Sequence, residues 1–118
     1  YWGDAYLRPL AWLSSNAPSR ARVVICQPGI IGTLVDSYRG AVVREDLEFT
    51  EDPRELRSAD YCVFHTRRNE VWPQARVLLD RGRPVYVWDL DGAPLAVVYE
   101  AAEVRRVLSE GNAEPAAN

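Results

Sequence analysis

The sequence predicts a three-layer α/β fold, Rossmann-like, with a mostly parallel sheet and a C-terminal antiparallel β-hairpin. Short runs rich in Val and Ile alternate with amphipathic segments, which is typical of a parallel sheet covered by helices on both faces. The chain has 47% hydrophobic and 26% charged residues, an ordinary globular composition. Its 118 residues match the usual size of a single domain with one core.

The first element is a helix. Apolar residues recur at helical spacing between residues 4 and 17. Pro9 is tolerated in the first turn of a helix, so we expect the helix to begin near Ala5 or Tyr6. The Asn16-Ala17-Pro18 sequence should end it.

The later elements alternate between strand and helix patterns. Asp91-Gly92 predicts a tight hairpin turn between the last two strands. We expect one domain over residues 1–110 and a flexible tail over 111–118. The predicted elements are a central strand at Arg22 to Cys26, a short helix at Ile30 to Tyr38, strand segments at Ala41 to Arg44 and Leu47 to Phe49, a helical turn at Glu51 to Leu56, a strand at Tyr61 to Thr66, a helix at Trp72 to Leu79, strands at Pro84 to Trp88 and Leu95 to Tyr99, and a helix at Ala101 to Leu108.

The charge of the chain excludes some functions. A net charge of -3 and a pI near 5.1 provide no basic field for a phosphate backbone, so we expect no nucleic-acid partner. All 14 basic residues are Arg, which excludes lysine chemistry. No apolar run approaches the ~20 residues that cross a bilayer. The chain begins at Tyr1 and contains no Met, so we expect it to be part of a longer protein.

Asp89-Leu90-Asp91-Gly92 follows an apolar strand, as does the nucleophile motif of haloacid dehalogenase-like phosphatases. Such an enzyme needs further cationic and acidic residues after the motif, and only 26 residues follow Gly92. A structural turn is therefore the favoured interpretation, with a phosphatase that uses Asp89 and Asp91 as a competing hypothesis. No catalytic residue, metal ligand or cofactor is predicted.

The strand at Arg22 to Cys26 and the glycines after it imitate a dinucleotide-binding fingerprint. Gln27 stands where the first glycine of that fingerprint makes its tight turn, and Pro28 lacks the backbone N–H that would bind a pyrophosphate. The pattern leaves open a small Rossmann-like module that binds a nucleotide or an anionic metabolite near Gly29 and Arg67.

His65 ends the strand at Tyr61 to Thr66, beside Arg67 and Arg68, where open α/β sheets usually bind ligands. Gly29, His65, Arg67 and Arg68 are therefore the candidate ligand-binding residues, because two arginines can bind an anionic group. A structural or incidental His65 and a solvated arginine pair in a loop are the favoured interpretations, and ligand binding is the competing hypothesis. One histidine alone cannot complete a metal site.

Cys26 and Cys62 both lie in predicted strands. If those strands are neighbours, the two thiols can meet. Two cysteines do not make a disulfide framework, and two buried free thiols are more common, so free thiols are the favoured interpretation and a disulfide is the alternative.

Three segments, in this order over roughly residues 1–100, resemble the soluble C-terminal domain of bacterial membrane glycosyltransferases. The group is the protein-mannosyltransferase-like and aminoarabinose-transferase-like (GT-C) group. The order and spacing of the segments carry the resemblance. The segments are Tyr1-Trp2-Gly3 with Trp12 to Pro18 and Ala21-Arg22-Val23, then Glu51-Asp52-Pro53 with Ser58-Ala59-Asp60-Tyr61, and finally Gly92 to Glu100.

The resemblance implies a function and a location. In that group, membrane helices precede such a domain, which lies outside the cytoplasm, and the catalytic carboxylates lie near the N-terminus of the full protein. The chain is then expected to be a non-catalytic extracytoplasmic accessory domain, periplasmic or on the cell surface, of an enzyme that uses a polyprenyl-phosphate sugar. Its partners would be the membrane-embedded remainder of the same polypeptide and a sugar or glycan acceptor.

Overall fold

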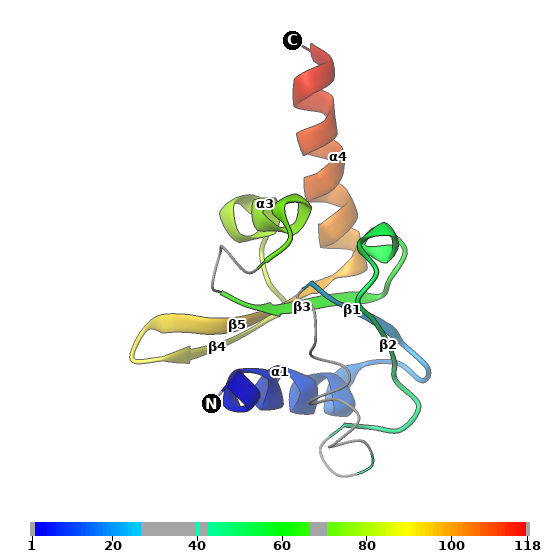
Figure 1. The fold of residues 1–118 in the computed structure, drawn as a ribbon, viewed down its shortest axis with the longest axis vertical. Helices are drawn as coiled ribbons and strands as arrows, with labels where there is room; N and C mark the ends of the chain where they lie inside the picture. Colours follow the sequence, from blue (N-terminus) through cyan, green and yellow to red (C-terminus); the bar gives the residue numbers. More distant parts are fainter. Residues whose placement is uncertain (1, 27–39, 41–42, 67–70, 118) are drawn as a thin grey trace.

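A computed structural model describes residues 2–26, 40, 43–66 and 71–117. Five strands form one sheet, which is flanked by helices (Figure 1). The helix predicted at residues 30–38 lies outside the described residues. The elements are α1 (Trp2–Asn16), β1 (Arg22–Ile25), β2 (Glu48–Thr50), the 3-10 turn η2 (Pro53–Glu55), β3 (Tyr61–His65), α3 (Pro73–Arg81), β4 (Tyr86–Leu90), β5 (Ala93–Glu100) and α4 (Ala101–Ala117).

The sheet is mixed, with the strand order β2-β1-β3-β5-β4. Among the described strands, β1 pairs in parallel with β2 and with β3, and β5 pairs antiparallel with β3 and with β4. The predicted mostly parallel, three-layer Rossmann-like fold is therefore wrong. The middle strand is β3, whereas the sequence placed the strand at Arg22 to Cys26 at the centre.

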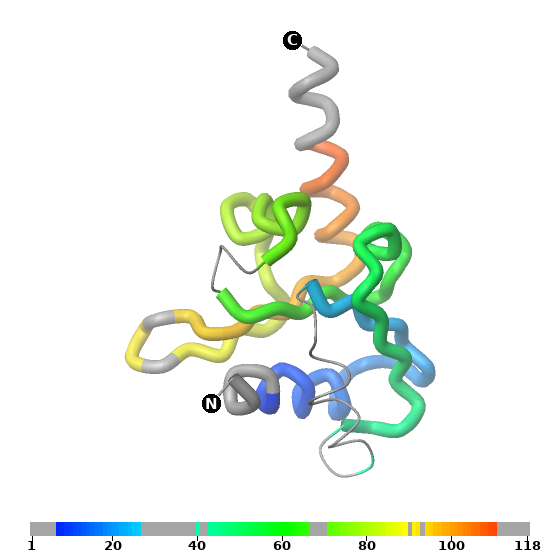
Figure 2. Tube along the Cα trace, in the orientation of Figure 1, coloured from blue at the N-terminus to red at the C-terminus, as the bar shows by residue number. Residues whose placement is uncertain are grey.

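The position of β5 explains this difference. β4 runs in the same direction as β3, but β5 lies between them, which makes β3-α3-β4 a split β-α-β unit. Residues 96–99 of β5 are all buried, whereas exposure alternates along β4. A continuous apolar strand is more stable inside the sheet than at its edge, so β5 takes the inner place and β4 the outer one. Figure 2 traces β5 from the hairpin along β3 and into α4.

Each face of the sheet packs against different helices (Figure 1). Val23 and Ile25 point to one face and join a core with Leu10 and Leu13 of α1. Side chains of alternate residues in β1 and β3 point to the other face, where they meet residues of α3 and α4. This second core includes Val24, Phe64, Ala75, Leu78, Val104 and Val107.

Helix α1 begins at Trp2 and contains Pro9 inside it, so the predicted start near Ala5 or Tyr6 is wrong. An internal proline removes one backbone hydrogen bond from a helix. The chain tolerates this loss because Pro9, Leu10 and Leu13 are all buried, the two leucines at 0% exposure against the sheet. Tertiary packing here outweighs a local helix-breaking signal.

The predicted C-terminal hairpin is present. Leu90 pairs with Ala93, which leaves a two-residue turn at Asp91 and Gly92 with φ values of 53° and 85°. The helical turn at Pro53 is also present as η2. Helix α4 continues past the predicted end at Leu108, to Ala117. The domain limit at residue 110 and the flexible tail stay predictions. No helix in the described part of the chain has the length and apolar character needed to cross a bilayer.

Candidate functional site

The predicted ligand-binding residues follow the carboxyl ends of β1 and β3. These strands are parallel neighbours, with Ile25 in register with Val63, so their carboxyl ends meet at one edge of the sheet. Open α/β sheets usually bind ligands at the carboxyl ends of their strands. Of the four predicted residues, only His65 lies within the described residues. Gly29, Arg67 and Arg68 lie outside them.

His65 is the last residue of β3 and is 4% exposed. It pairs with Ala96 of β5. Strand alternation places it on the face of Tyr61 and Val63, whereas Cys62 belongs to the opposite face. His65 and Cys62 therefore do not form a common site, and ligand binding by His65 stays a prediction.

Thr66 fastens the end of β3 to the start of β5. Its backbone N–H donates to the carbonyl oxygen of Leu95 at 3.1 Å, and its hydroxyl donates to the carbonyl oxygen of Pro94 at 2.8 Å. The backbone N–H of Trp72 donates to the carbonyl oxygen of Cys26 at 3.3 Å. Backbone groups at this edge thus bind one another, which fixes the positions of the strand ends.

Asp89 and Asp91 lie on the hairpin that joins β4 and β5. Asp89 is exposed in β4 and pairs with Pro94, and Asp91 is exposed in the turn. Within the described residues, no group of three or more His, Cys, Asp or Glu side chains is placed to bind a metal ion. Asp91 and Gly92 of the motif form the turn, as the favoured interpretation predicted.

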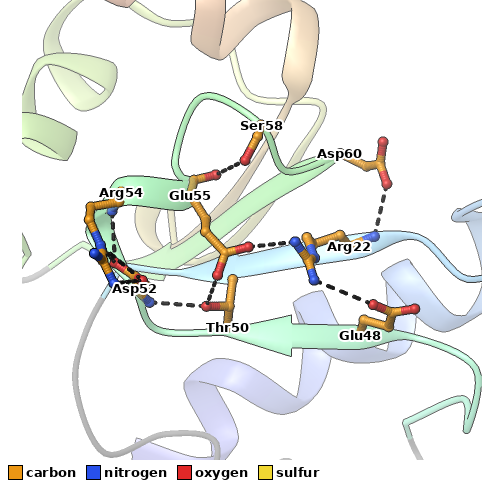
Figure 3. Close-up of polar contacts among 8 residues, drawn as sticks. All are labelled: Arg22, Glu48, Thr50, Asp52, Arg54, Glu55, Ser58 and Asp60. Atoms are coloured by element: carbon orange, nitrogen blue, oxygen red, sulfur yellow. Dashed lines mark hydrogen bonds and ion pairs between the residues drawn. The ribbon is translucent and has the colours of Figure 1, made fainter.

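A polar network that the sequence analysis did not identify joins the start of β1 to β2 and η2 (Figure 3). The carboxylate of Glu55 accepts a 2.6 Å hydrogen bond from the Arg22 guanidinium and a 2.9 Å bond from the Thr50 hydroxyl. Arg22 also lies 3.7 Å from the carboxylate of Glu48. Arg22 contacts residues 26 and 33 positions away in sequence, Glu48 and Glu55, which explains why no local pattern indicated the network.

Asp52 and Asp60 bind backbone N–H groups beside this network, at the start of η2 and at the start of β1. Asp52 caps η2 by accepting the backbone N–H of Arg54 at 3.0 Å. The hydrogen bonds from the Arg54 side chain and backbone lower the pKa of Asp52 below its usual value. The carboxylate of Asp60 accepts the backbone N–H of Arg22 at 2.8 Å. These carboxylates bind cations and backbone donors of their own chain, an arrangement suited to structural stabilisation.

A shallow surface depression lies between the end of α1 and the segment before β2. Its walls include Ser14, Ser15, Val43, Arg44 and Glu45. The guanidinium of Arg44 donates to the carbonyl oxygens of Ser14 at 3.0 Å and Pro18 at 2.7 Å and forms an ion pair with Asp46. Because these groups of its own chain already bind the guanidinium, Arg44 fastens α1 to the sheet and is poorly suited to bind an external anion.

Comparison with protein families, curated proteins and solved structures finds no match for the chain.

Proposed function

We propose that the chain is a non-catalytic extracytoplasmic accessory domain of a membrane glycosyltransferase that uses a polyprenyl-phosphate sugar. In this proposal the domain packs against the membrane-embedded remainder of the same polypeptide and positions the acceptor. The proposal starts from the order of the three segments that resemble the GT-C group. It gains support from the roles that the residues of those segments have in the fold.

The residues of the resembling segments act as structural fasteners. Asp60, from the second segment, accepts the backbone N–H of Arg22, from the first segment, and the backbone N–H of Asp60 donates to the Arg22 carbonyl at 2.8 Å. Asp52 of the second segment caps η2. Gly92 of the third segment completes the hairpin turn with φ of 85°. These contacts are structural, as the proposal requires of an accessory domain.

The single observation that carries the proposal is the exposure of apolar side chains at the outer edge of the sheet. Val85, which immediately precedes β4, is 38% exposed, and Val87 within β4 is 41% exposed. In β4, the edge of the sheet beyond β5, backbone groups of alternate residues point away from the neighbouring strand. Exposed apolar side chains on an open edge are typical of an interaction surface. We assign this edge to the contact with the rest of the polypeptide.

The test uses the full-length gene product in membranes. The assay measures sugar transfer from a polyprenyl-phosphate donor for the parent protein and for Val87→Asp. We expect at least a tenfold loss of transfer in the variant, with no loss in Ser109→Asp, which adds the same charge at an exposed position on α4. Unchanged sugar transfer by Val87→Asp would show that the β4 edge does not contact the rest of the polypeptide.

Two outcomes would overturn the function itself. One is a full-length protein without hydrophobic spans of ~20 residues. The other is turnover of any substrate by the isolated 118-residue chain. A thermal-shift screen of nucleotides and sugar phosphates tests the competing ligand-binding function, since a ligand at 100 times its dissociation constant adds ~2.7 kcal/mol of stability.

A further inference from the structure

Cys26 and Cys62 occupy the same face of two neighbouring strands. Cys62 is in register with Val24 of β1, and Cys26 follows two residues later, where its backbone N–H donates to the carbonyl oxygen of Val63 at 3.2 Å. Both cysteines belong to the core between the sheet and helices α3 and α4. Their Sγ atoms lie 2.9 Å apart, and both residues are 0% exposed.

The surroundings of this thiol pair exclude a reactive cysteine. Burial, followed by the neighbouring thiol of Cys26, raises the pKa of Cys62 well above its usual value. A nucleophilic or metal-binding cysteine needs the thiolate, which exposed and electropositive sites favour. A structural zinc site needs four ligands, and none of the described residues completes a group of three around this pair. The remaining chemistry for two adjoining thiols is their oxidation to one another.

We propose that Cys26 and Cys62 form a disulfide, made by thiol–disulfide exchange with a small-molecule or protein disulfide while the chain is unfolded or locally open. One thiol loses its proton and its thiolate attacks the oxidant, which forms a mixed disulfide and releases one reduced thiol. The other cysteine then loses its proton and attacks the first Sγ, which releases the second reduced thiol. Two electrons and two protons thus pass from the cysteines to the oxidant.

Burial has opposite effects before and after this step. In the folded, reduced protein, neither Sγ atom is accessible to an oxidant, so exchange requires an opening of the core. Once the disulfide has formed and the core has closed, the same packing excludes reducing thiols. The cross-link joins two residues 36 positions apart, so it also restricts the unfolded chain and stabilises the fold.

This inference stands on the thiol pair alone and does not rest on the proposed function. An extracytoplasmic location would supply the oxidising conditions under which disulfides persist. A failure to find the disulfide would leave the glycosyltransferase assay unaffected, and a failure of that assay would leave the thiol chemistry unaffected.

The experiment begins with protein that is reduced and unfolded in denaturant. It is refolded in a mixture of oxidised and reduced glutathione, quenched with acid to stop exchange, and then unfolded at neutral pH in denaturant that contains an excess of an alkylating reagent. We expect neither cysteine to be alkylated, a mass lower by two hydrogen atoms than that of the reduced protein, and one cross-linked peptide joining Cys26 and Cys62. Alkylation of both cysteines, or a mixed disulfide with glutathione as the final product, would overturn the proposal.

Two further measurements test the role of burial. Glutathione disulfide added to the folded, reduced protein should form the cross-link at least tenfold more slowly than it does during refolding. An equal rate would contradict the claim that burial protects the two thiols from the oxidant. The melting temperature of the oxidised protein should exceed that of the reduced protein by about 10 °C. In the control Cys26→Ala/Cys62→Ala, reductant should not change the melting temperature. A parent protein whose melting temperature is also unaffected by reductant would contradict the stabilising role.

Discussion

The hydroxyl group of Tyr99 donates a 2.9 Å hydrogen bond to the backbone carbonyl of Leu78, which joins β5 to α3. The same carbonyl accepts the backbone N–H of Gly82 at 2.8 Å. Tyr99 is 2% exposed, and its ring stacks on that of Phe64 with centroids 5.7 Å apart. Burial raises the pKa of the Tyr99 hydroxyl, so the group stays protonated and continues to donate at mildly alkaline pH.

The first prediction concerns this hydroxyl. Tyr99→Phe should lower the free energy of unfolding by about 1 kcal/mol, since it removes one buried hydrogen bond. The loss stays moderate because Gly82 still donates to the Leu78 carbonyl. Urea unfolding measures the change. Tyr99→Leu, which also removes the stacking on Phe64, should cost more, and a Tyr99→Phe protein as stable as the parent would contradict the assigned role of the bond.

The second prediction contrasts two glycines. A Cβ at Gly82 would lie 2.8 Å from the Leu78 carbonyl oxygen and 3.0 Å from a ring carbon of Tyr99, so Gly82→Ala should destabilise the fold by about 1–3 kcal/mol through overpacking. A Cβ at Gly92 meets no atom within 4 Å, but φ there is 85°. Gly92→Ala should therefore lose about 1 kcal/mol through backbone strain alone.

Asparagine distinguishes these two causes, because it tolerates the left-handed backbone better than alanine does. Thermal unfolding should show Gly92→Asn to be more stable than Gly92→Ala. At position 82 the order should not favour asparagine, since the cause there is crowding. If Gly92→Asn proved no better than Gly92→Ala, the hairpin turn would not depend on positive φ at this position.

The third prediction concerns pH. Hydrogen bonds from the Arg106 guanidinium and the backbone N–H of Arg83 lower the pKa of Glu103 to about 2, from an ordinary value of 4.5. A carboxylate whose pKa is lower in the folded state stabilises the fold above the unfolded pKa, and this stabilisation is lost as the pH falls through the folded pKa. The contribution of Glu103 is therefore complete above about pH 4.5 and lost as the pH approaches about 2.

Glu103→Gln tests this linkage. The variant should be less stable than the parent at pH 7, and the difference should shrink as the pH is lowered below 4.5. Unfolding by urea at a series of pH values measures both curves. The control Glu100→Gln removes a carboxylate from an exposed position at the end of β5. A difference between Glu103→Gln and the parent that is independent of pH would assign the effect to shape and not to charge.

The fourth prediction concerns the network in Figure 3. Glu55→Gln keeps the shape of the side chain but removes the charge that pairs with Arg22. Because the side chains of Glu55 and Arg22 are 27% and 48% exposed, the loss should be no more than about 1 kcal/mol. The difference from the parent should also become smaller in 1 M salt, since salt screens exposed charges. A loss that salt does not change would mean that the hydrogen bond to Thr50, and not the ion pair, is responsible.

Local signals predicted several elements of the fold correctly. Asp91-Gly92 specified the hairpin turn because few residue pairs adopt positive φ at both positions. The apolar run at Tyr61 to Thr66 identified β3, and Asp52-Pro53 identified the η2 turn through its cap. In each case the information lies within a few neighbouring residues.

The neighbours of each strand were not predictable in the same way. The sequence identified β5 as a strand, but whether β4 or β5 pairs with β3 depends on which strand gains more from a central position. The contrast between the buried residues 96–99 and the alternating exposure of β4 was the available signal. Pro9 does not mark the start of α1, because the local free-energy cost of an internal proline is smaller than the stabilisation that α1 gains from packing.

The candidate site was predicted only in part. The sequence placed His65 at the carboxyl end of a strand, and the structure adds that this end adjoins that of β1. The pairing of Asp60 with Arg22 joins residues 38 positions apart, so it follows from the parallel sheet and not from any motif. The contact between the two thiols likewise required knowledge that β1 and β3 are neighbours.

The place of β5 between β3 and β4 also bears on synthesis of the chain by the ribosome. The ladder of β3 from Tyr61 to His65 is completed by residues 96–100, the last to emerge among all the strands. Until they leave the exit tunnel, one edge of β3 lacks its hydrogen-bonding partner and the nascent sheet can hold only β2, β1 and β3 together. A chain released before residue 96 would thus leave the backbone N–H and C=O groups on one edge of β3 unpaired. Translational stalling at this point should therefore favour aggregation or degradation over partial folding.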